Sequence, residues 1–254
     1  MMRIQLSLAA LALLSLGCSA RDDQQAGTPG AGEHGGTLVI SSPADADILF
    51  PPLVGTIAGH QVADIIFERL AEPGEKLNTI GDVGFTGELA KSWTWSPDSL
   101  SIAFQLDPQA RWHDGRAVRA TDVRFTHALY TDSALAAPVA SLLANIDSVT
   151  VRDSLTAVFW FARRTPEQFF EAAFQMSILP EHLLSQLEPA ALRTAQFVTN
   201  PVGSGQYRFG RWEKGARIEL LADTSHYRGR PNIDRVIWTV APDPATATTK
   251  VLAG

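Results

Sequence analysis

The side chains best suited to chemistry in this sequence are His113 and Asp114, neighbours in the run Trp112-His113-Asp114-Gly115. A histidine and an aspartate can serve a nucleophile as general base and orienting group, provided that all three side chains converge in space. Adjacent residues of a tight turn point apart, and no nucleophile stands at a spacing that indicates convergence. We therefore interpret Asp114-Gly115 as turn residues with Trp112 packed beneath them, and expect no catalytic site here.

The remaining histidines and the glycine-rich run 201–205 do not form a metal or nucleotide motif. None of the six histidines stands in an HxxxH or HExxH pair, which would put two metal ligands on one face of a helix. The run Pro-Val-Gly-Ser-Gly lacks the third glycine of a dinucleotide fingerprint, and no phosphate-loop lysine follows it. We expect no cofactor, and interpret Gly203 and Gly205 as residues of a sharp backbone turn where two domains meet.

A different kind of site is indicated at residues 54–59, Val-Gly-Thr-Ile-Ala-Gly, which lie between a predicted strand and a predicted helix. Loops in that position commonly border ligand clefts. Gly55 and Gly59 have no side chain, so a ligand could approach the main chain closely and bind it through backbone hydrogen bonds. An ordinary connecting loop is the alternative interpretation of the same residues.

Several helices are predicted around these segments. Apolar residues recur with the helical period over 60–70. Thr121 is a good N-cap for a helix in which Asp122 stands near the positive end of the dipole. Thr165-Pro166 followed by Gln168 predicts a further helix start, because it combines an N-cap, a proline and a glutamine three residues after the cap. Shorter signals predict helices at Pro180 and from about Pro244.

Strands alternate with these helices in no regular order. Residues 100–106 alternate between apolar and polar, which is the period of a half-buried strand. Irregular mixing of the two kinds of element, without βαβ repetition, indicates a mixed α/β (α+β) fold. The other strands are predicted over 37–41, 146–151, 156–161, 206–212, 216–221 and 235–240. The strands 146–151 and 156–161 are predicted to form a hairpin.

Composition and charge exclude one class of partner. The chain has 254 residues, of which 45% are apolar, and it carries 21 Lys and Arg against 27 Asp and Glu, for a net charge of −6. Without a basic stripe to neutralise phosphates, a nucleic-acid partner is disfavoured. The single cysteine, Cys18, cannot form an internal disulfide.

The first seventeen residues have the pattern of an export signal, 1–17. Arg3 precedes an uncharged run from Leu6 to Leu16, which is shorter than the roughly 20 residues of a membrane span. Cys18 directly follows the small Gly17, as in a lipobox whose cysteine is acylated, although Ser15 replaces the usual leucine. We expect a lipid anchor at Cys18, with an incidental thiol in a plain secretory signal as the alternative.

Residues 18–36 are interpreted as a flexible linker behind that anchor. From Ser19 to Gly36 the chain contains no large apolar residue, so it cannot bury enough surface to order itself. The composition changes at Thr37 to an apolar, strand-like run, and we expect the folded part to begin there. The expected location is therefore the periplasm or cell envelope, with attachment to the membrane through the N-terminal lipid.

Several segments in order resemble the family 5 extracellular solute-binding proteins, the peptide, dipeptide and nickel binders of bacterial ABC transporters. Each motif alone is weak, but together they cover nearly everything from Gly35 to Gly254. The matching segments are Gly35 to Ile40, Phe67-Glu68-Arg69-Leu70, Leu89 to Trp93, Trp112 to Gly115 with Ala120 to Val123, Leu179 to His182, Asn200 to Tyr207, and Tyr227 to Pro231.

The resemblance implies a periplasmic-binding-protein-like fold with two lobes, of which mainly the first is present. It implies a central sheet domain made of 37–54 and 198–254, and a smaller domain, 55–197, inserted into it. It places ligand-contacting residues in the first loop and in a later region. The implied ligand-lining residues are Gly55, Thr56, Ile57, Ala58, Gly59, Tyr227 and Arg228.

The function implied by the resemblance is capture of oligopeptides, dipeptides or a similar small solute, which is then delivered to the permease subunits of an ABC importer. A binder of nickel complexes or oligosaccharides is the alternative within the family, and His60 is then a minor metal candidate. A secreted hydrolase is the alternative outside it, but the sequence has no nucleophile elbow, zinc motif or paired carboxylates. A surface lipoprotein with an adhesive or structural role is the third class. We expect a binding protein and no enzyme.

The C-terminal end predicts an incomplete fold. The chain stops at Gly254, within the last predicted helix and without a helix stop signal, so we interpret it as a fragment. Apolar residues around Ile218, Leu220, Ile237 and Trp238 are expected to lack partners and to stay exposed.

Overall fold

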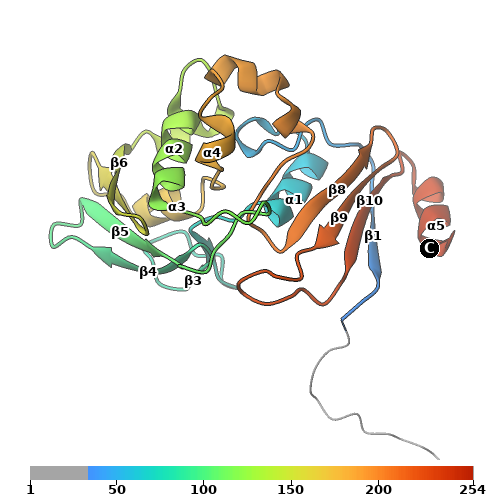
Figure 1. Ribbon diagram of the computed structural model, residues 1–254, viewed down its shortest axis with the longest axis horizontal. Helices are drawn as coiled ribbons and strands as arrows, with labels where there is room; N and C mark the ends of the chain where they lie inside the picture. The colour runs from blue at the N-terminus through green and yellow to red at the C-terminus, as the bar shows by residue number, and fades with distance from the viewer. Residues whose placement is uncertain (1–33, 254) are drawn as a thin grey trace, which may run out of the picture. The chain divides into compact units, whose positions relative to one another are not determined.

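A computed structural model describes residues 34–253, so the expected signal sequence, the lipidated Cys18 and most of the expected linker lie outside the described residues (Figure 1). The described residues belong to one compact unit. Their strands are β1 (Thr37–Ser42), β2 (Ala71–Pro73), β3 (Phe85–Gly87), β4 (Ala90–Trp95), β5 (Ser101–Leu106), β6 (Ile146–Asp153), β7 (Thr156–Phe161), β8 (Tyr207–Glu213), β9 (Arg217–Ala222) and β10 (Arg235–Val240). Their α-helices are α1 (Ile57–Ile66), α2 (Ala120–Thr131), α3 (Gln168–Ala173), α4 (Glu181–Leu184) and α5 (Pro244–Ala253), and their 3-10 helices are η1 (Pro51–Leu53), η2 (Pro138–Leu143), η3 (Pro189–Thr194) and η4 (Gln196–Val198).

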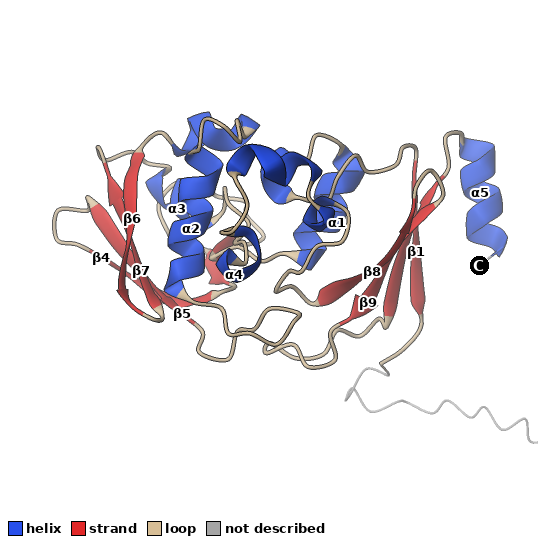
Figure 2. Ribbon diagram, turned by 45° about the horizontal axis from the view of Figure 1, so that its top comes forward, coloured by secondary structure: helices blue, strands red, loops and turns tan. Residues whose placement is uncertain are grey.

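The first sheet joins the two ends of the described chain. Its strand order is β1-β10-β9-β8, in which β1 runs parallel to β10 and the other pairs are antiparallel. Helix α1 lies on one side of this sheet, and α5 contacts β1 on the other (Figure 2). Residues 37–42 and 207–240 therefore form one sheet, as the resemblance implied, while the exact domain boundaries stay a prediction.

The expectation that Ile218, Leu220 and Trp238 stay exposed is wrong, although Leu38 and Leu221 of the same sheet are exposed. Ile218, Leu220 and Trp238 are buried, and only Ile237 is half-exposed. The three buried side chains belong to the same apolar cluster as Val62 and Ile66 of α1. Helix α1 thus supplies the partner that the sequence pattern of the strands could not reveal.

The second sheet has the order β4-β5-β7-β6, and all of its pairs are antiparallel. The predicted β6–β7 hairpin is confirmed, and Asp153 shapes its turn by accepting hydrogen bonds from Leu155 N (2.9 Å) and the Thr156 hydroxyl (2.7 Å). Helix α2 packs against β6 and β7. Inside, Phe104 and Phe159 meet edge to face at 5.4 Å between ring centroids.

Three predicted helix starts differ from the structure by two or three residues. Helix α1 begins at Ile57 rather than His60, because the Thr56 hydroxyl caps it by accepting from Gly59 N (3.1 Å). Helix α2 begins after Arg119 rather than Thr121, and Asp122 accepts from Arg119 N (2.8 Å).

Helix α3 begins at Gln168, and Thr165 does not cap it. The Thr165 hydroxyl accepts a hydrogen bond from the Asn145 amide at 3.3 Å, and no side chain caps the helix. Gln168 Oε1 nevertheless accepts from Thr165 N (3.1 Å), which is the reciprocal half of the predicted capping arrangement. Only one half of the predicted capping arrangement therefore forms.

Candidate ligand-binding site

The predicted ligand segment 54–59 is partly helix. Gly55 and Thr56 precede α1, whereas Ile57, Ala58 and Gly59 form its first turn. The expected loop therefore ends at Thr56, because the hydroxyl of this residue starts the helix. None of the hydrogen bonds among the described residues uses the backbone N–H of Ile57 or Ala58. Free N–H groups at a helix N-terminus suit a negatively charged or carbonyl group of a ligand.

Asp47 holds this segment in place. Its carboxylate accepts hydrogen bonds from Gly55 N (2.8 Å) and from the Thr56 hydroxyl (2.9 Å). Burial opposes ionisation of Asp47, but the hydrogen bonds from Ile48 N, Gly55 N and Thr56 outweigh it and lower the pKa of the carboxyl. The sequence contained no signal for this role, since Asp47 contacts residues eight and nine positions later.

The two glycines of the segment serve the fold as well as any ligand. A Cβ on Gly59 would lie 2.8 Å from Val54 Cγ1 and 2.9 Å from Asp47 Oδ1, so only glycine fits there. Gly55 is exposed, and a Cβ there would lie 3.1 Å from Asp47 Oδ2. The surface that this segment offers consists of Gly55, half-exposed Thr56 and Ile57, which is 79% exposed.

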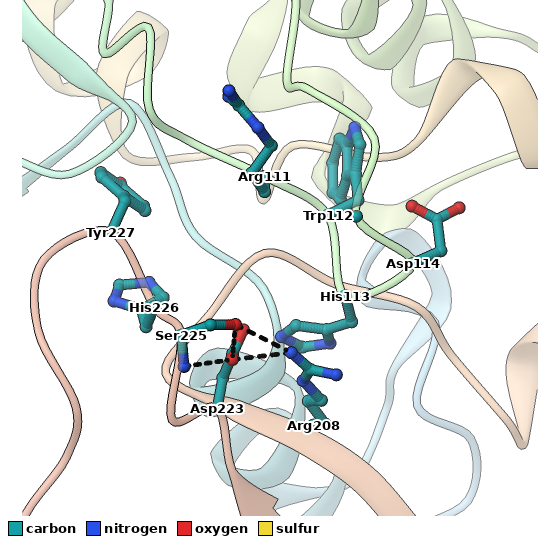
Figure 3. Close-up of a pocket in the computed structure, with 10 residues that line it drawn as sticks. Arg111, Trp112, His113, Asp114, Arg208, Asp223, Ser225, His226 and Tyr227 are labelled. Atoms are coloured by element: carbon teal, nitrogen blue, oxygen red, sulfur yellow. Dashed lines mark hydrogen bonds and ion pairs between the residues drawn. The ribbon is translucent and has the colours of Figure 1, made fainter.

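Tyr227, one of the two residues of the second predicted group, lines a cavity of about 380 Å³ (Figure 3). The turn 111–115 forms one part of its wall, and β8 with the segment after β9 forms the rest. Tyr227 contributes its ring to this wall. The lining residues are Arg111, Trp112, His113, Asp114, Gly115, Arg208, Asp223, Ser225, His226 and Tyr227.

The His113-Asp114 neighbours point to different partners, as the turn interpretation predicted. Asp114 Oδ2 lies 2.7 Å from His182 Nε2. Partial burial opposes ionisation of Asp114, but hydrogen bonds from His182 and Arg116 N outweigh it and lower its pKa. Gly115 has φ +89°, and its N–H donates to Trp112 O (2.8 Å), which closes the turn. The expected turn is confirmed.

His113 joins the turn to the glycine-rich run. Its Nδ1 accepts from Gly203 N (3.2 Å), which leaves the hydrogen on Nε2 to be donated to Gly205 O (2.9 Å). Burial lowers the pKa of His113 and favours this neutral form. Both ring nitrogens are therefore occupied by the backbone.

The interpretation of Gly203 and Gly205 as residues of a sharp backbone turn is incomplete, because the chain does bend at Gly205 and Gln206 but close packing is what requires glycine. Neither residue has positive φ. A Cβ on Gly203 would lie 1.9 Å from Ile66 O, and one on Gly205 would lie 2.3 Å from Ile65 O. The glycines let residues 203–205 pass directly against the C-terminal end of α1, where Gly205 N donates to Ile66 O (2.8 Å).

Tyr227 and Arg228 use their polar groups internally. The Tyr227 hydroxyl lies 3.0 Å from Glu68 Oε1, and Arg228 Nη2 lies 2.8 Å from the same oxygen. Arg228 Nη2 also donates to Glu88 Oε1 (3.0 Å). Glu68 belongs to one of the matching motifs, but the sequence indicates no role for it. Nothing in the sequence indicates that Glu88 binds the same arginine.

The structure does not bring the two groups of predicted residues together. Residues 55–59 lie at the N-terminal end of α1, whereas Tyr227 and Arg228 contact Glu68, just beyond its C-terminal end. A ten-residue helix is about 15 Å long. A single compact ligand cannot touch both groups in this chain, although an extended ligand could.

Neither a metal cluster nor a membrane span occurs in the described part of the chain. Across 34–253 no three His, Cys, Asp or Glu side chains come together in a way that could hold a metal ion, and His60 is exposed. Within the same residues no helix combines the length and the apolar character that crossing a membrane requires.

Comparison with known proteins decides the family. The profile described as bacterial extracellular solute-binding proteins, family 5 Middle, matches residues 84–254. A Brucella ovis protein named for peptide binding in an ABC transporter is 32% identical over 206 residues, which are 81% of this chain and 38% of that protein. The chain belongs to family 5 of the bacterial extracellular solute-binding proteins.

Solved structures of family 5 proteins share the fold. The oligopeptide-binding protein AppA of Bacillus subtilis, in complex with a nonapeptide, superposes with a TM-score of 0.81 at 25% identity, covering 88% of this chain and 44% of AppA. NikZ of Campylobacter jejuni, in complex with Ni(L-His), gives 0.75 at 26% identity, covering 86% of this chain and 42% of NikZ. The mixed α/β, periplasmic-binding-protein-like fold is thus confirmed.

The chain spans about two fifths of the length of the curated relatives it matches. Those relatives are named as binding proteins, including a di/tripeptide-binding protein of Pseudomonas aeruginosa that is 29% identical over 239 residues, 84% of this chain and 42% of that protein. The family itself is described as extracellular solute-binding proteins.

Proposed function

We propose that this chain forms one wall of the binding cleft of an ABC-importer solute-binding protein, and that the solute is a peptide or a similar small molecule. The observation that carries the proposal is the exposed N-terminal end of α1 in a family 5 chain with peptide-binding relatives. Ile57 supplies apolar surface, and the N–H groups of Ile57 and Ala58 are available for the carbonyl or carboxylate oxygens of a peptide.

The proposed ligand-lining residues are the same as those expected from the sequence, but only part of each group is accessible to a ligand. Gly55, Thr56 and Ile57 provide the accessible part of the first group, with Ala58 and Gly59 contributing backbone. In the second group, Tyr227 offers the ring that lines the cavity, and Arg228 offers the exposed third of its side chain.

The remaining steps of the proposal concern the whole protein. A second lobe closes over the solute, and the closed form docks on the permease subunits. Acylation of Cys18 holds the protein at the membrane of the periplasm or cell envelope. No bond of the solute is broken in this role, so we propose a binding protein and no enzyme.

Calorimetric titration tests the proposal. A mixture of dipeptides to nonapeptides is titrated into the longest product of the gene, with Ni(L-His) as a separate arm because NikZ shares the fold. Ile57→Asp is expected to weaken peptide binding, whereas Leu221→Asp, a matched change at an exposed apolar residue of the first sheet, is expected to leave it unchanged. Equal loss in both variants, or no peptide binding by the unaltered protein, would contradict the proposal. Binding of Ni(L-His) alone would favour the nickel-complex alternative.

A further inference from the structure

Three consecutive residues after β9 converge on one buried carboxylate. Glu68 is 2% exposed and stands two residues beyond α1. Its Oε1 lies 3.0 Å from the Tyr227 hydroxyl, 2.8 Å from Arg228 Nη2 and 3.4 Å from His226 Nε2. Because the partners are about 160 residues apart in the chain, these contacts join distant segments.

The hydrogen positions fit this arrangement. His226 Nδ1 accepts from Arg228 N (3.3 Å), so the ring hydrogen belongs on Nε2, which faces Glu68. Burial raises the pKa of the Tyr227 hydroxyl, which therefore remains a hydrogen-bond donor. Arg228 and the Tyr227 hydroxyl are thus the hydrogen-bond donors to Glu68, whereas His226 Nε2 lies 3.4 Å from Oε1 without forming a hydrogen bond.

Glu88 adds a second carboxylate to the group. Its Oε1 accepts from Arg228 Nη2 (3.0 Å), and its Oε2 accepts from Arg69 N (2.8 Å). Its backbone oxygen lies 3.0 Å from the Tyr227 hydroxyl. One guanidinium therefore bridges two carboxylates that both come from the segment between α1 and β4.

We propose that Glu68 is the positioning residue for segment 226–228, and that Glu88 assists it. If the donors were lost, the buried carboxylate would keep a charge that nothing compensates. The set of hydrogen bonds is therefore more stable when it is complete than when one donor is missing. By holding Tyr227 and His226, Glu68 fixes one side of the cavity that these two residues line. This role is independent of what the cleft binds.

Trypsin gives a local readout, because the Arg228–Gly229 bond is a cleavage site inside the held segment. In the full 254-residue chain, Glu68→Gln keeps the shape of the side chain and removes its charge. We expect cleavage after Arg228 to rise about tenfold or more relative to cleavage after Arg152, since a lost charge-assisted hydrogen bond favours local opening by about that factor. Arg152, an exposed residue of the β6–β7 hairpin, serves as the internal reference.

Glu219→Gln is the matched control. Glu219 is also a mostly buried carboxylate in an ion pair, 3.2 Å from Arg235, but it lies on the first sheet away from segment 226–228. It is expected to leave the ratio of the two cleavage rates unchanged. An unchanged ratio in Glu68→Gln, or a parallel rise at both sites, would overturn the proposed positioning role.

A second variant covers the case in which Glu68→Gln does not fold. Tyr227→Phe removes one donor to Glu68 and keeps the cleavage site at Arg228. We expect a rise of about threefold in the same ratio, since a single neutral hydrogen bond contributes less than a charged one. No rise in this variant would equally overturn the proposal. Neither measurement uses a ligand, so failure here is separable from failure of the proposed function.

Discussion

Replacing Glu88 by glutamine is expected to remove a pH dependence from the stability of this protein. Burial raises the pKa of Glu88 from 4.5 to about 7, with repulsion from Glu72 and Glu68 adding to it and Arg69 N and Arg228 opposing it. Because the folded state binds this proton more tightly than the unfolded state, Glu88 contributes stability that is fully present below pH 4.5. That contribution is lost as the pH rises through about 7.

The size of the effect follows from the shift. At about 1.4 kcal/mol for each tenfold change in proton affinity, a rise from 4.5 to about 7 corresponds to about 3 kcal/mol. The Glu88 side chain is 13% exposed, so solvent screening reduces this free-energy contribution only a little. The free energy of unfolding of the unaltered protein, minus that of Glu88→Gln, is therefore expected to fall by about 3 kcal/mol between pH 4.5 and 8.

Urea unfolding followed by tryptophan fluorescence at pH 4.5, 6, 7 and 8 measures this difference. Asp98→Asn is the control, because hydrogen bonds from the Ser96 hydroxyl and Leu100 N lower the pKa of Asp98 below its ordinary 3.8. Asp98 is ionised throughout the range in both states, so its variant is expected to differ from the unaltered protein by a constant amount. A constant difference for Glu88→Gln, or one that grows with rising pH, would refute the reasoning.

Gly203→Ala is expected to destabilise the fold by about 3 kcal/mol in urea unfolding, because its Cβ would lie 1.9 Å from Ile66 O. Gly55→Ala, with ordinary φ and 3.1 Å to Asp47 Oδ2, is expected to cost under about 1 kcal/mol, and equal effects would contradict the packing argument. Mass spectrometry of the mature N-terminus is expected to find an acylated Cys18, and an unmodified start at residue 19 or later would exclude the anchor. Titration of the peptide mixture into the 254-residue chain is expected to give much weaker binding than into a longer gene product, since one wall buries less of a ligand than the roughly 70–90% typical of good pockets. Binding by the chain at least as tight would show that no further lobe is needed.

Local patterns in the sequence determined most of the secondary structure. Alternation over 100–106 predicted β5 within a residue, because the period of two is a property of the strand itself, and the strand predicted over 235–240 is β10. The short strands β2 and β3 escaped prediction, since three residues each give no period to detect. Helix starts were displaced by two or three residues, as at α1, which the Thr56 hydroxyl caps and which begins three residues before the predicted start.

The family was likewise determined by the sequence, because ordered motifs persist along the chain. The sequence did not determine the structural role of the individual motif residues. Glu68 and the Trp112-Gly115 turn stood in recognised motifs, yet their partners, His226 to Arg228 and His182, lie far along the chain. The sequence shows which residue types occur and says nothing about which pairs meet.

Only the tertiary structure decided what each candidate residue contacts. Gly203 and Gly205 are glycines because the end of α1 passes against them, a cause that the sequence alone cannot distinguish from the conformation of a turn. Tyr227 and Arg228 were expected at a ligand, and the structure commits their polar groups to Glu68 and Glu88. The physical reason is the same in each case: periodicity and capping act over a few residues, whereas close approach and charge pairing depend on how distant segments pack.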